Sequence, residues 1–176
     1  MGLRMFMSDL RAASKSSAVL VNLKWFLFSH SLHMVLLVRL GQDCYRIPLL
    51  GKLFGFLVEY FIRIVFGSDI SCRAKIGPGF VIQHGHDIVI GSEVTIGSGC
   101  KIFNGVTLGN KDVSVNAFGE QPTVGNGAVF CTGAKILGPL SIGDNVVVGA
   151  NSVLLRDCPS NTVFAGVPAV MIRDCR

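Results

Sequence analysis

A six-residue repeat of large apolar side chains runs from residue 70 to residue 154 and limits the possible folds of this chain more than any other feature. Thirteen positions carry it, in runs spaced six apart: Ile70, Ile76, Ile82, Ile90, Ile96, Ile102, Leu108, Val124, Phe130, Ile136, Ile142, Val148 and Leu154. A period of six matches neither an α-helix nor an alternating strand. It is typical of a β-helix, in which each hexapeptide forms one short side of a triangular coil and successive coils stack about 4.8 Å apart.

Glycine follows the apolar anchor at seven of the thirteen places, and a small residue often lies two positions before the anchor. The residue after an anchor begins a corner of the coil, and glycine tolerates the positive φ that a sharp corner can need. We therefore expect seven glycines to turn the corners: Gly77, Gly91, Gly97, Gly109, Gly125, Gly143 and Gly149.

The repeat is interrupted twice. The step from Ile82 to Ile90 is eight residues long, which adds two residues within 83–87. The step from Leu108 to Val124 is sixteen residues long and predicts a projecting loop within 110–121. Interruptions of a regular scaffold are where function is expected, and the first contains the only two histidines outside residues 1–66.

Residues 1–66 are predicted to form an α-helical region, and residues 67–176 the β-helix with a C-terminal tail. A short helix is expected over 5–13 and apolar helical clusters over 18–40, ending at Gly41. Pro48 is a plausible first-turn residue of the next helix, because apolar residues from there to Phe66 recur at spacings of three and four.

The segment 48–66 is apolar enough to allow three interpretations. In the first interpretation, the segment is a helix whose broad apolar face packs on the β-helix or on a sister subunit. Alternatively, a basic and aromatic helical cap within residues 18–66 lies on an anionic membrane. A membrane span is the third, although Lys52, Glu59 and Arg63 count against it, because charges at membrane depth are unfavourable.

The charge is unevenly distributed. Residues 1–66 hold eight Lys and Arg against three Asp and Glu, whereas residues 67–176 hold eight of each. The β-helix is therefore neutral overall, which argues against a nucleic-acid-binding surface. The six cysteines are scattered and form no CxxC pair, which indicates reduced structural thiols. No signal peptide is recognisable, so we expect a cytoplasmic protein. Under the membrane interpretation it lies at the inner face of the membrane.

His84 lies in the first interruption, and Asp69 precedes it by fifteen residues, close to one coil of three hexapeptides. A carboxylate beside an imidazole fixes its tautomer and stabilises the imidazolium, which is the arrangement of a general base. The alternative is a histidine held in a turn by backbone hydrogen bonds. His86 is expected to face solvent or to support the site, and Asp87 to serve the turn.

Several motifs occur in order along the repeat: Asp69-Ile70, Ala74 to Gly79, His84, Ile88 to Gly91, Gly105 to Gly109, Gly133 to Gly138 and Ala165 to Ala169. In these motifs the chain resembles the serine acetyltransferases of the hexapeptide-repeat superfamily, from Ser68 to about Ile172. The resemblance implies a left-handed parallel β-helix, a homotrimer and acetyl-CoA bound between neighbouring subunits. It also implies that His84 deprotonates the acceptor hydroxyl, that Asp69 orients His84, and that no covalent enzyme intermediate forms.

The same resemblance implies a set of residues that hold acetyl-CoA, with no metal ion: Gly109, Asn110, Thr132, Gly133, Ala134, Lys135, Ala150, Gly166, Val167 and Pro168. A zinc enzyme like the β-helical carbonic anhydrases is disfavoured, because zinc catalysis needs three protein ligands and the β-helix contains only His84 and His86. A non-catalytic scaffold is disfavoured because Asp69 and His84 are both present at the family spacing.

The expected acceptor site departs from the family pattern. Gln83 stands where the family has Asp, Ser92 where it has Glu, and Glu120-Gln121 where it has Arg-His; with His86, these form the predicted acceptor-binding set. Losing the Arg removes a bidentate clamp for a carboxylate, and amides suit sugar hydroxyls. We therefore expect an O-acetyltransferase acting on a sugar in surface-polysaccharide synthesis, with serine O-acetyltransferase of cysteine biosynthesis as the alternative.

Overall fold

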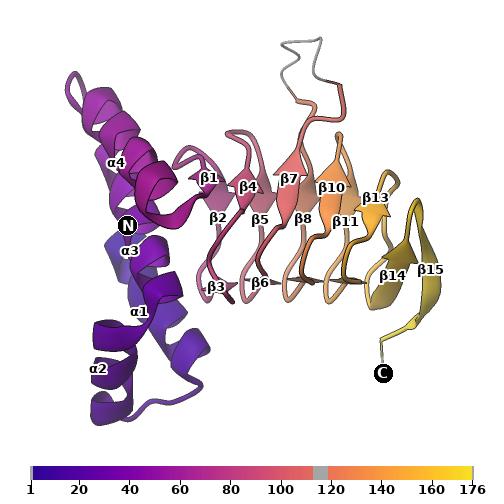
Figure 1. The fold of residues 1–176 in the computed structure, drawn as a ribbon, viewed down its shortest axis with the longest axis horizontal. Helices are drawn as coiled ribbons and strands as arrows, with labels where there is room; N and C mark the ends of the chain where they lie inside the picture. Colours follow the sequence, from indigo (N-terminus) through magenta and orange to yellow (C-terminus); the bar gives the residue numbers. More distant parts are fainter. Residues whose placement is uncertain (1, 113–118, 176) are drawn as a thin grey trace.

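A computed structural model describes residues 2–112 and 119–175 (Figure 1). Four α-helices gather at one end of a long β-structure and form the helical region: α1 (Gly2–Ser14), α2 (Val19–Phe28), α3 (His30–Cys44) and α4 (Gly51–Phe66). The chain then passes through Gly67 and Ser68 into strands that wind away from the helices, so the two ends of the described chain lie far apart (Figure 1).

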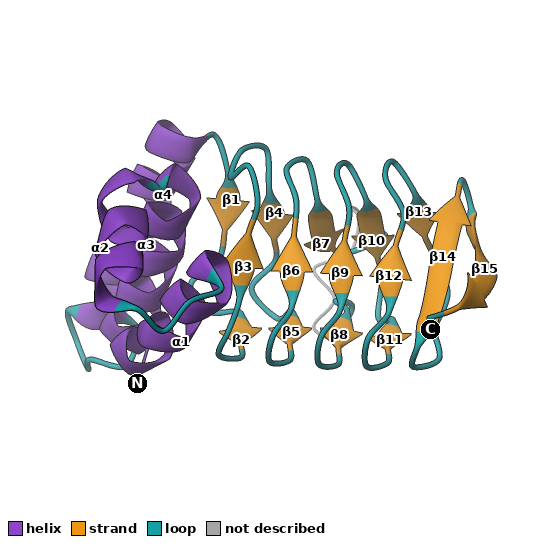
Figure 2. Ribbon diagram, turned by 90° about the horizontal axis from the view of Figure 1, so that it is seen from below, coloured by secondary structure: helices purple, strands orange, loops and turns teal. Residues whose placement is uncertain are grey.

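Three parallel sheets form the sides of the β-structure, and successive strands along the chain belong to different sheets (Figure 2). Sheet A contains β1 (Asp69–Ile70), β4 (Val89–Ile90), β7 (Thr107–Gly109), β10 (Lys135–Leu137) and β13 (Val153–Leu154). Sheet B contains β2 (Lys75–Ile76), β5 (Thr95–Ile96), β8 (Thr123–Val124) and β11 (Ser141–Ile142). Sheet C contains β3 (Val81–Ile82), β6 (Lys101–Ile102), β9 (Val129–Phe130), β12 (Val147–Val148), β14 (Thr162–Gly166) and β15 (Ala169–Asp174). The strands β14 and β15 form an antiparallel hairpin that closes the far end.

The thirteen apolar anchors of the repeat all lie inside this three-sided coil, where each is at most 5% exposed. The strand register shows the coil length. Val89 pairs with Thr107, a step of 18 residues, whereas Asp69 pairs with Val89, a step of 20. The two additional residues are those predicted within 83–87. The predicted β-helix is therefore confirmed, and the first interruption falls in its first coil.

The glycines that follow the anchors are needed for a reason other than the predicted one. None of the seven has positive φ; that conformation occurs instead at corner glycines such as Gly99 and Gly133. A Cβ at Gly97 would lie 2.5 Å from the carbonyl oxygen of Gly125, and one at Gly77 would lie 2.7 Å from Gly97. Close stacking of one coil on the next therefore requires most of these glycines, and Gly109, with open space around it, is an exception.

The helices differ from the predicted ones mainly at their ends. The apolar stretch 18–40 is two helices, because the chain bends by 87° at Ser29, whose side chain caps α3 by accepting a hydrogen bond from the Leu32 N–H. Helix α3 continues past Gly41 to Cys44. Pro48 is not in the first turn of the next helix but in the turn before α4, which begins at Gly51 and ends at Phe66. The residue that follows, Gly67, has a left-handed conformation.

A buried ion pair fastens the helices to the first coil. Asp9 of α1 and Arg39 of α3 are at most 1% exposed and meet at 2.8 Å. Arg39 also donates to the carbonyl oxygens of Ile76 and Gly77, and Asp9 accepts from the N–H of Phe80. Each charge therefore has hydrogen bonds beyond its partner, which a buried pair needs to offset its lost hydration. We call these contacts the Asp9–Arg39 clasp.

Helix α4 is attached to the same coil through Glu59. Its carboxylate accepts hydrogen bonds from the Cys72 N–H at 2.7 Å, the Ser71 hydroxyl at 3.1 Å and the Tyr45 hydroxyl at 3.2 Å. The inner face of α4 buries Ile62 and Phe66. This part of the helix fits the first interpretation of the sequence, in which it packs on the β-helix, and its outer face is described below.

Candidate functional site

The predicted site residues lie on two different edges of the β-helix. We call the corner segments between sheets C and A the site edge; they are residues 83–88, 103–106, 131–134 and 149–152. We call the segments between sheets A and B the loop edge; they are residues 71–74, 91–94, 138–140 and the described part of 110–122. Because sheet A separates the two edges, residues on one edge do not face residues on the other within one protomer.

His84 occupies the corner of the first coil at the site edge. Its backbone is left-handed, with φ of 56°, and the same holds for Asp87, with φ of 54°. The imidazole is exposed and lies 6.4 Å, centroid to centroid, from the Phe103 ring of the next coil. A non-glycine residue in this conformation is uncommon, so the two inserted residues push an accessible histidine outward at the edge.

Helix α3 stabilises this corner. The Gly85 N–H donates to the Ser31 hydroxyl at 2.9 Å, and a Cβ at Gly85 would lie 2.6 Å from the methyl group of Met34. Ser31 was not singled out by the sequence, because nothing in its local pattern predicts a contact 54 residues away. The helical region therefore sets the conformation of the corner that carries His84.

Asp69 starts sheet A beside the same corner, but its recorded partner is Arg63 rather than His84. The Arg63 guanidinium donates to the Asp69 carboxylate at 2.7 Å, and both side chains are about half exposed. This hydrogen bond raises the pKa of Arg63. Within the described residues no hydrogen bond joins Asp69 to His84, so the predicted orientation of His84 by Asp69 stays a prediction.

His86 lies over the junction between the helical region and the β-helix. A Cβ at Gly67 would be 3.1 Å from its Nε2 atom, and the carbonyl oxygen of His86 accepts from the Gly105 N–H. Gln83 is half-buried at the same corner. Two of the five predicted acceptor-binding residues, Gln83 and His86, thus share the site edge with His84.

The other three predicted acceptor-binding residues lie at the loop edge. The Gln121 side-chain oxygen accepts from the Glu93 N–H at 2.9 Å, and the Glu93 carboxylate accepts from the Gly119 N–H at 2.8 Å. Gln121 therefore braces the base of the loop, a structural task that its sequence position did not indicate. Ser92 and Glu120 flank it, both half-buried. Residues 113–118 of the predicted projecting loop lie outside the described residues.

The predicted acetyl-CoA residues are also divided between the edges. Thr132, Gly133, Ala134 and Ala150 belong to the site edge, with Lys135 directly after it, and Gly166, Val167 and Pro168 form the tip of the β14–β15 hairpin. Gly109 and Asn110 instead lie toward the loop edge, where the buried Oδ1 of Asn110 has no hydrogen-bond partner among residues 2–112 and 119–175. Ala134 is fully buried, so its side chain cannot contact a ligand.

The site edge is long enough for an extended thioester donor. From the His84 corner to the hairpin tip the edge rises by four coil steps, roughly 19 Å at about 4.8 Å per step, which is of the order of an extended pantetheine chain. Contacts between coils hold the edge in place: Lys135 Nζ donates to the Gly105 carbonyl at 2.7 Å, and the Thr132 hydroxyl contacts the Asn104 side chain at 3.1 Å. The assignment of these residues to acetyl-CoA stays a prediction.

Burial makes the thiols near the site poor nucleophiles. It raises the pKa of the Cys131 thiol at the site edge and raises the pKa of Cys72 to about 12. A thiol must ionise to act as a nucleophile. Among residues 2–112 and 119–175, no three His, Cys, Asp or Glu side chains are placed to hold a metal ion.

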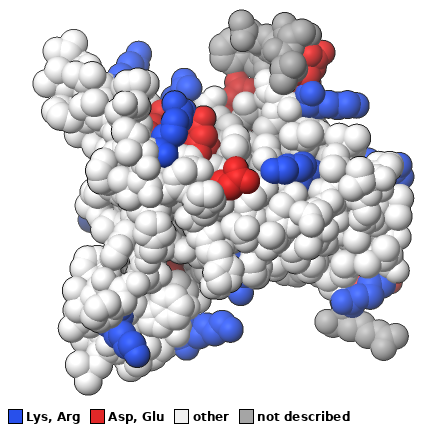
Figure 3. All heavy atoms as spheres, viewed as in Figure 1, with Lys and Arg blue, Asp and Glu red and all other residues white. Residues whose placement is uncertain are grey.

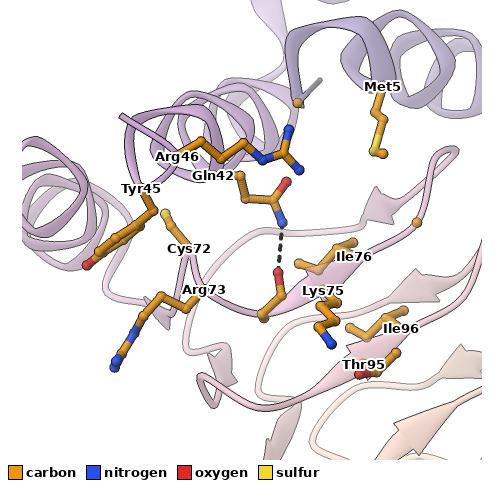
Figure 4. Close-up of a pocket in the computed structure, with 13 residues that line it drawn as sticks. Met5, Gln42, Tyr45, Arg46, Cys72, Arg73, Lys75, Ile76, Thr95 and Ile96 are labelled. Carbon is orange, nitrogen blue, oxygen red and sulfur yellow. Dashed lines mark hydrogen bonds between the residues drawn. The ribbon is translucent and has the colours of Figure 1, made fainter. Parts of the chain in front are cut away.

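A cavity of about 510 Å³ lies away from the site edge, between the helical region and the first two coils (Figure 4). Gln42, Arg46, Arg73 and Lys75 are among its lining residues, and Gln42 donates to the Ala74 carbonyl at 2.9 Å. None of the predicted site residues lines it.

No family model matches the chain. Over 154 residues the chain is 35% identical to a serine acetyltransferase of Helicobacter pylori, and this alignment covers 85% of this chain and 86% of that relative. It is 39% identical over 127 residues to a serine acetyltransferase of Synechococcus elongatus, covering 72% of this chain and 50% of the relative. The chain thus spans about half the length of some of the curated relatives it matches.

Solved structures agree with these relatives. The fold matches serine acetyltransferase of Neisseria gonorrhoeae with a TM-score of 0.90 and 27% identity, covering 99% of this chain and 66% of that one. It matches a serine acetyltransferase in complex with CoA with a TM-score of 0.85 and 30% identity, covering 97% and 69%. The three-sided coil is accordingly a left-handed parallel β-helix. On this sequence identity, coverage and fold, the chain belongs to the serine acetyltransferase family.

Proposed function

We propose that this chain is an acetyl-CoA-dependent O-acetyltransferase that uses His84 as its general base. The observation that carries the proposal is the exposed His84 at the head of an edge that can hold an extended thioester donor, in a member of the serine acetyltransferase family. One relative of known structure was solved in complex with CoA.

His84 takes the proton of the acceptor hydroxyl while the hydroxyl oxygen attacks the thioester carbonyl carbon. The carbon–sulfur bond then breaks, and the departing thiolate takes the proton back from the imidazolium. Backbone N–H groups near the site edge are suited to stabilise the developing oxyanion. Asp69, once released from Arg63, orients the imidazole.

L-serine is the acceptor that we propose, in place of the sugar expected from the sequence. The relatives reported above are named serine acetyltransferases, and solved relatives include a complex with serine and one with cysteine. The sugar expectation also relied on Gln121 as an acceptor ligand, and its amide oxygen is engaged by the Glu93 N–H. A sugar hydroxyl is the second candidate, favoured by Glu120 and Gln83 at positions where the family pattern has Arg and Asp.

We also propose that the enzyme works as a homotrimer. The predicted acceptor and cofactor residues divide between the site edge and the loop edge, with sheet A between them. If the loop edge of a neighbouring copy lies against the site edge, Ser92 and Glu120 of that copy join His84 and supply the second wall of the groove.

Steady-state transfer from acetyl-CoA tests the acceptor. The full chain is assayed with free L-serine and, in parallel, with a panel of nucleotide-linked sugars. We expect O-acetylserine formation with a Michaelis constant of about a millimolar or below and no transfer to the sugars. Transfer to a sugar without transfer to serine would reject serine and keep the acetyltransferase proposal; no transfer to either group, with no acetyl-CoA binding, would reject both.

A further inference from the structure

The outward surface of the helical region is the most unusual apolar surface of the described chain. Helix α2, with the sequence VLVNLKWFLF, has no buried residue at all. Val19, Leu20 and Phe28 are each about 80% exposed. A helix that is apolar over most of its surface is normally covered by protein or lipid. In the described chain α2 makes apolar contacts through Trp25, which packs against the core, and Phe26, which meets Phe6, so the rest of its surface needs a partner.

Helix α4 shows the same property on one side only. Its inner face buries Gly51, Gly55, Ile62 and Phe66. Its outer face carries eight large residues that are 44–64% exposed: Leu53, Phe54, Phe56, Leu57, Tyr60, Phe61, Ile64 and Val65. At 3.6 residues per turn these eight cover about half of the helix circumference. The amphipathic helix α4 thus turns its apolar side away from the protein.

In the described chain, the exposed charges on α2 and α4 that have no ion-pair partner are positive. Of the three acids in residues 1–66, Asp9 lies in the clasp, Glu59 is bonded to the first coil and Asp43 accepts from the Gly2 and Leu3 N–H groups. Lys24 on α2 and Lys52 on α4 are exposed, and in the described chain no carboxylate lies within ion-pair distance of either. In Figure 3 the outer parts of the helical region are largely uncharged, with Lys and Arg at intervals.

We propose that the exposed faces of α2 and α4 bind the surface of a lipid bilayer that contains anionic headgroups. Apolar side chains flanked by lysines are the composition that partitions into this layer, and each basic residue near an anionic surface adds roughly 1 kcal/mol of attraction. A two-fold contact between two copies of this face would instead oppose cations with cations, without carboxylates to offset them.

Binding at the surface is also the mode that fits the helix lengths. In the described residues no single helix is long and apolar enough to cross a membrane; only the bent pair α2 and α3 passes such a test together. Helix α3 is committed to the fold, since it buries Met34, Val35 and Arg39. The helices therefore lie along the lipid surface rather than through it.

The helical region that carries this surface is joined to the coil of the candidate site. The coil that carries His84 is joined to the helical region by the Ser31–Gly85 hydrogen bond and the Arg63–Asp69 ion pair. A protein bound through α2 and α4 would hold its site edge near the membrane. The lipid proposal does not rest on which acceptor the enzyme uses.

Vesicle flotation of the full chain tests the proposal. We expect binding to vesicles of mixed phosphatidylglycerol and phosphatidylcholine, and weaker binding to pure phosphatidylcholine or at high salt, because salt screens exposed charges. The double variant Lys24→Gln/Lys52→Gln should bind the mixed vesicles roughly 25-fold more weakly. The matched control Lys75→Gln/Arg156→Gln removes the same charge from the β-helix and should bind as wild type does.

A second pair of variants separates lipid from protein partners. Phe54→Ser/Leu57→Ser should lose vesicle binding without a change in the molar mass measured by light scattering, whereas Val170→Ser/Ile172→Ser on exposed β15 should keep it. Failure of the wild-type chain to bind mixed vesicles overturns the proposal. So does a smaller molar mass for Phe54→Ser/Leu57→Ser, since the face would then lie between copies of the chain.

Discussion

In the β-helix every anchor from Ile70 to Leu154 faces inward, whereas in the helical region α2 buries none of its residues and α4 exposes half of its circumference. The distribution of charged side chains between buried and exposed positions is the opposite. The helical region buries the Asp9–Arg39 pair, while the acids and bases of the β-helix lie at its surface or along its edges. One region is stabilised by repetition of a single local rule, and the other by a few specific long-range contacts.

This contrast determines where each region is vulnerable. A β-helix coil contacts only its neighbours, so a substitution there acts locally. The helices depend on contacts between residues that are at least 30 positions apart in sequence, as between Asp9 and Arg39 or Ser31 and Gly85. The predictions below use this difference, beginning with the coil at which the two regions meet.

Replacement of His84 should have the largest effect. His84→Ala should lower kcat by about two to four orders of magnitude, the usual contribution of a general base, while the protein still binds acetyl-CoA. Because His84 is exposed, the fold should be unchanged by circular dichroism. His86→Ala is the control on the same corner and should lose much less. Near wild-type turnover by His84→Ala would remove His84 from the mechanism.

Loss of Asp9 should separate the two regions. Asp9→Ala leaves the buried Arg39 without its counter-ion, which should cost about 3–5 kcal/mol of stability. Trp25, the only tryptophan, lies on α2 and reports on the helical region. In urea its fluorescence should change before the circular dichroism of the β-helix does. The double variant Asp9→Leu/Arg39→Met should regain part of the loss, and coincident transitions in Asp9→Ala would contradict the expected separation.

A glycine pair tests the corrected role of the glycines that follow the anchors. Gly97→Ala places a Cβ against the Gly125 carbonyl oxygen and should cost about 1–3 kcal/mol, the usual range for overpacking. Gly109→Ala has open space and ordinary φ, so the unfolding free energy should stay unchanged or rise by about 0.4–1 kcal/mol. Equal losses in the two variants, measured by thermal unfolding, would argue that corner conformation rather than coil spacing requires glycine.

The smallest effect concerns acid stability of the helical region. Burial tends to raise the pKa of Asp43, but hydrogen bonds from the Gly2 and Leu3 N–H groups help to lower it to about 2. A carboxyl whose pKa is lower in the folded state adds stability above its unfolded pKa of 3.8, and this contribution is lost as the pH falls toward 2. Wild type and Asp43→Asn should therefore differ modestly in unfolding free energy at pH 5 and converge near pH 2. A difference that persists at pH 2 would rule out this carboxylate as its source.

The β-helix could be predicted from the sequence because its rule is local and repeated. The anchor spacing gave the coils, and the eight-residue step from Ile82 to Ile90 located the corner that carries His84. The reason for the glycines was misjudged, because the close approach of Gly97 to Gly125 depends on residues of the next coil.

The helical region and the division of the site could not be predicted in the same way. No local pattern links Asp9 with Arg39, and the Arg63–Asp69 pair joins a helix to a strand across a turn. The acceptor residues form one set in the family pattern, yet Ser92, Glu120 and Gln121 lie on a different edge from His84. This division could not be predicted, because the order of motifs along the chain does not state which corner of the coil each motif occupies.

The 18-residue coil also sets the length of the site edge. The distance from the His84 corner to the tip formed by Gly166, Val167 and Pro168 is a whole number of coil steps. Deletion of one coil, residues 89–106, would shorten this distance by one step of about 4.8 Å. Every remaining side chain would stay on its own face of the β-helix. The length of substrate that the edge can span is therefore set by the number of coils. It can change only in whole turns of the coil, however freely the residues along the edge are substituted.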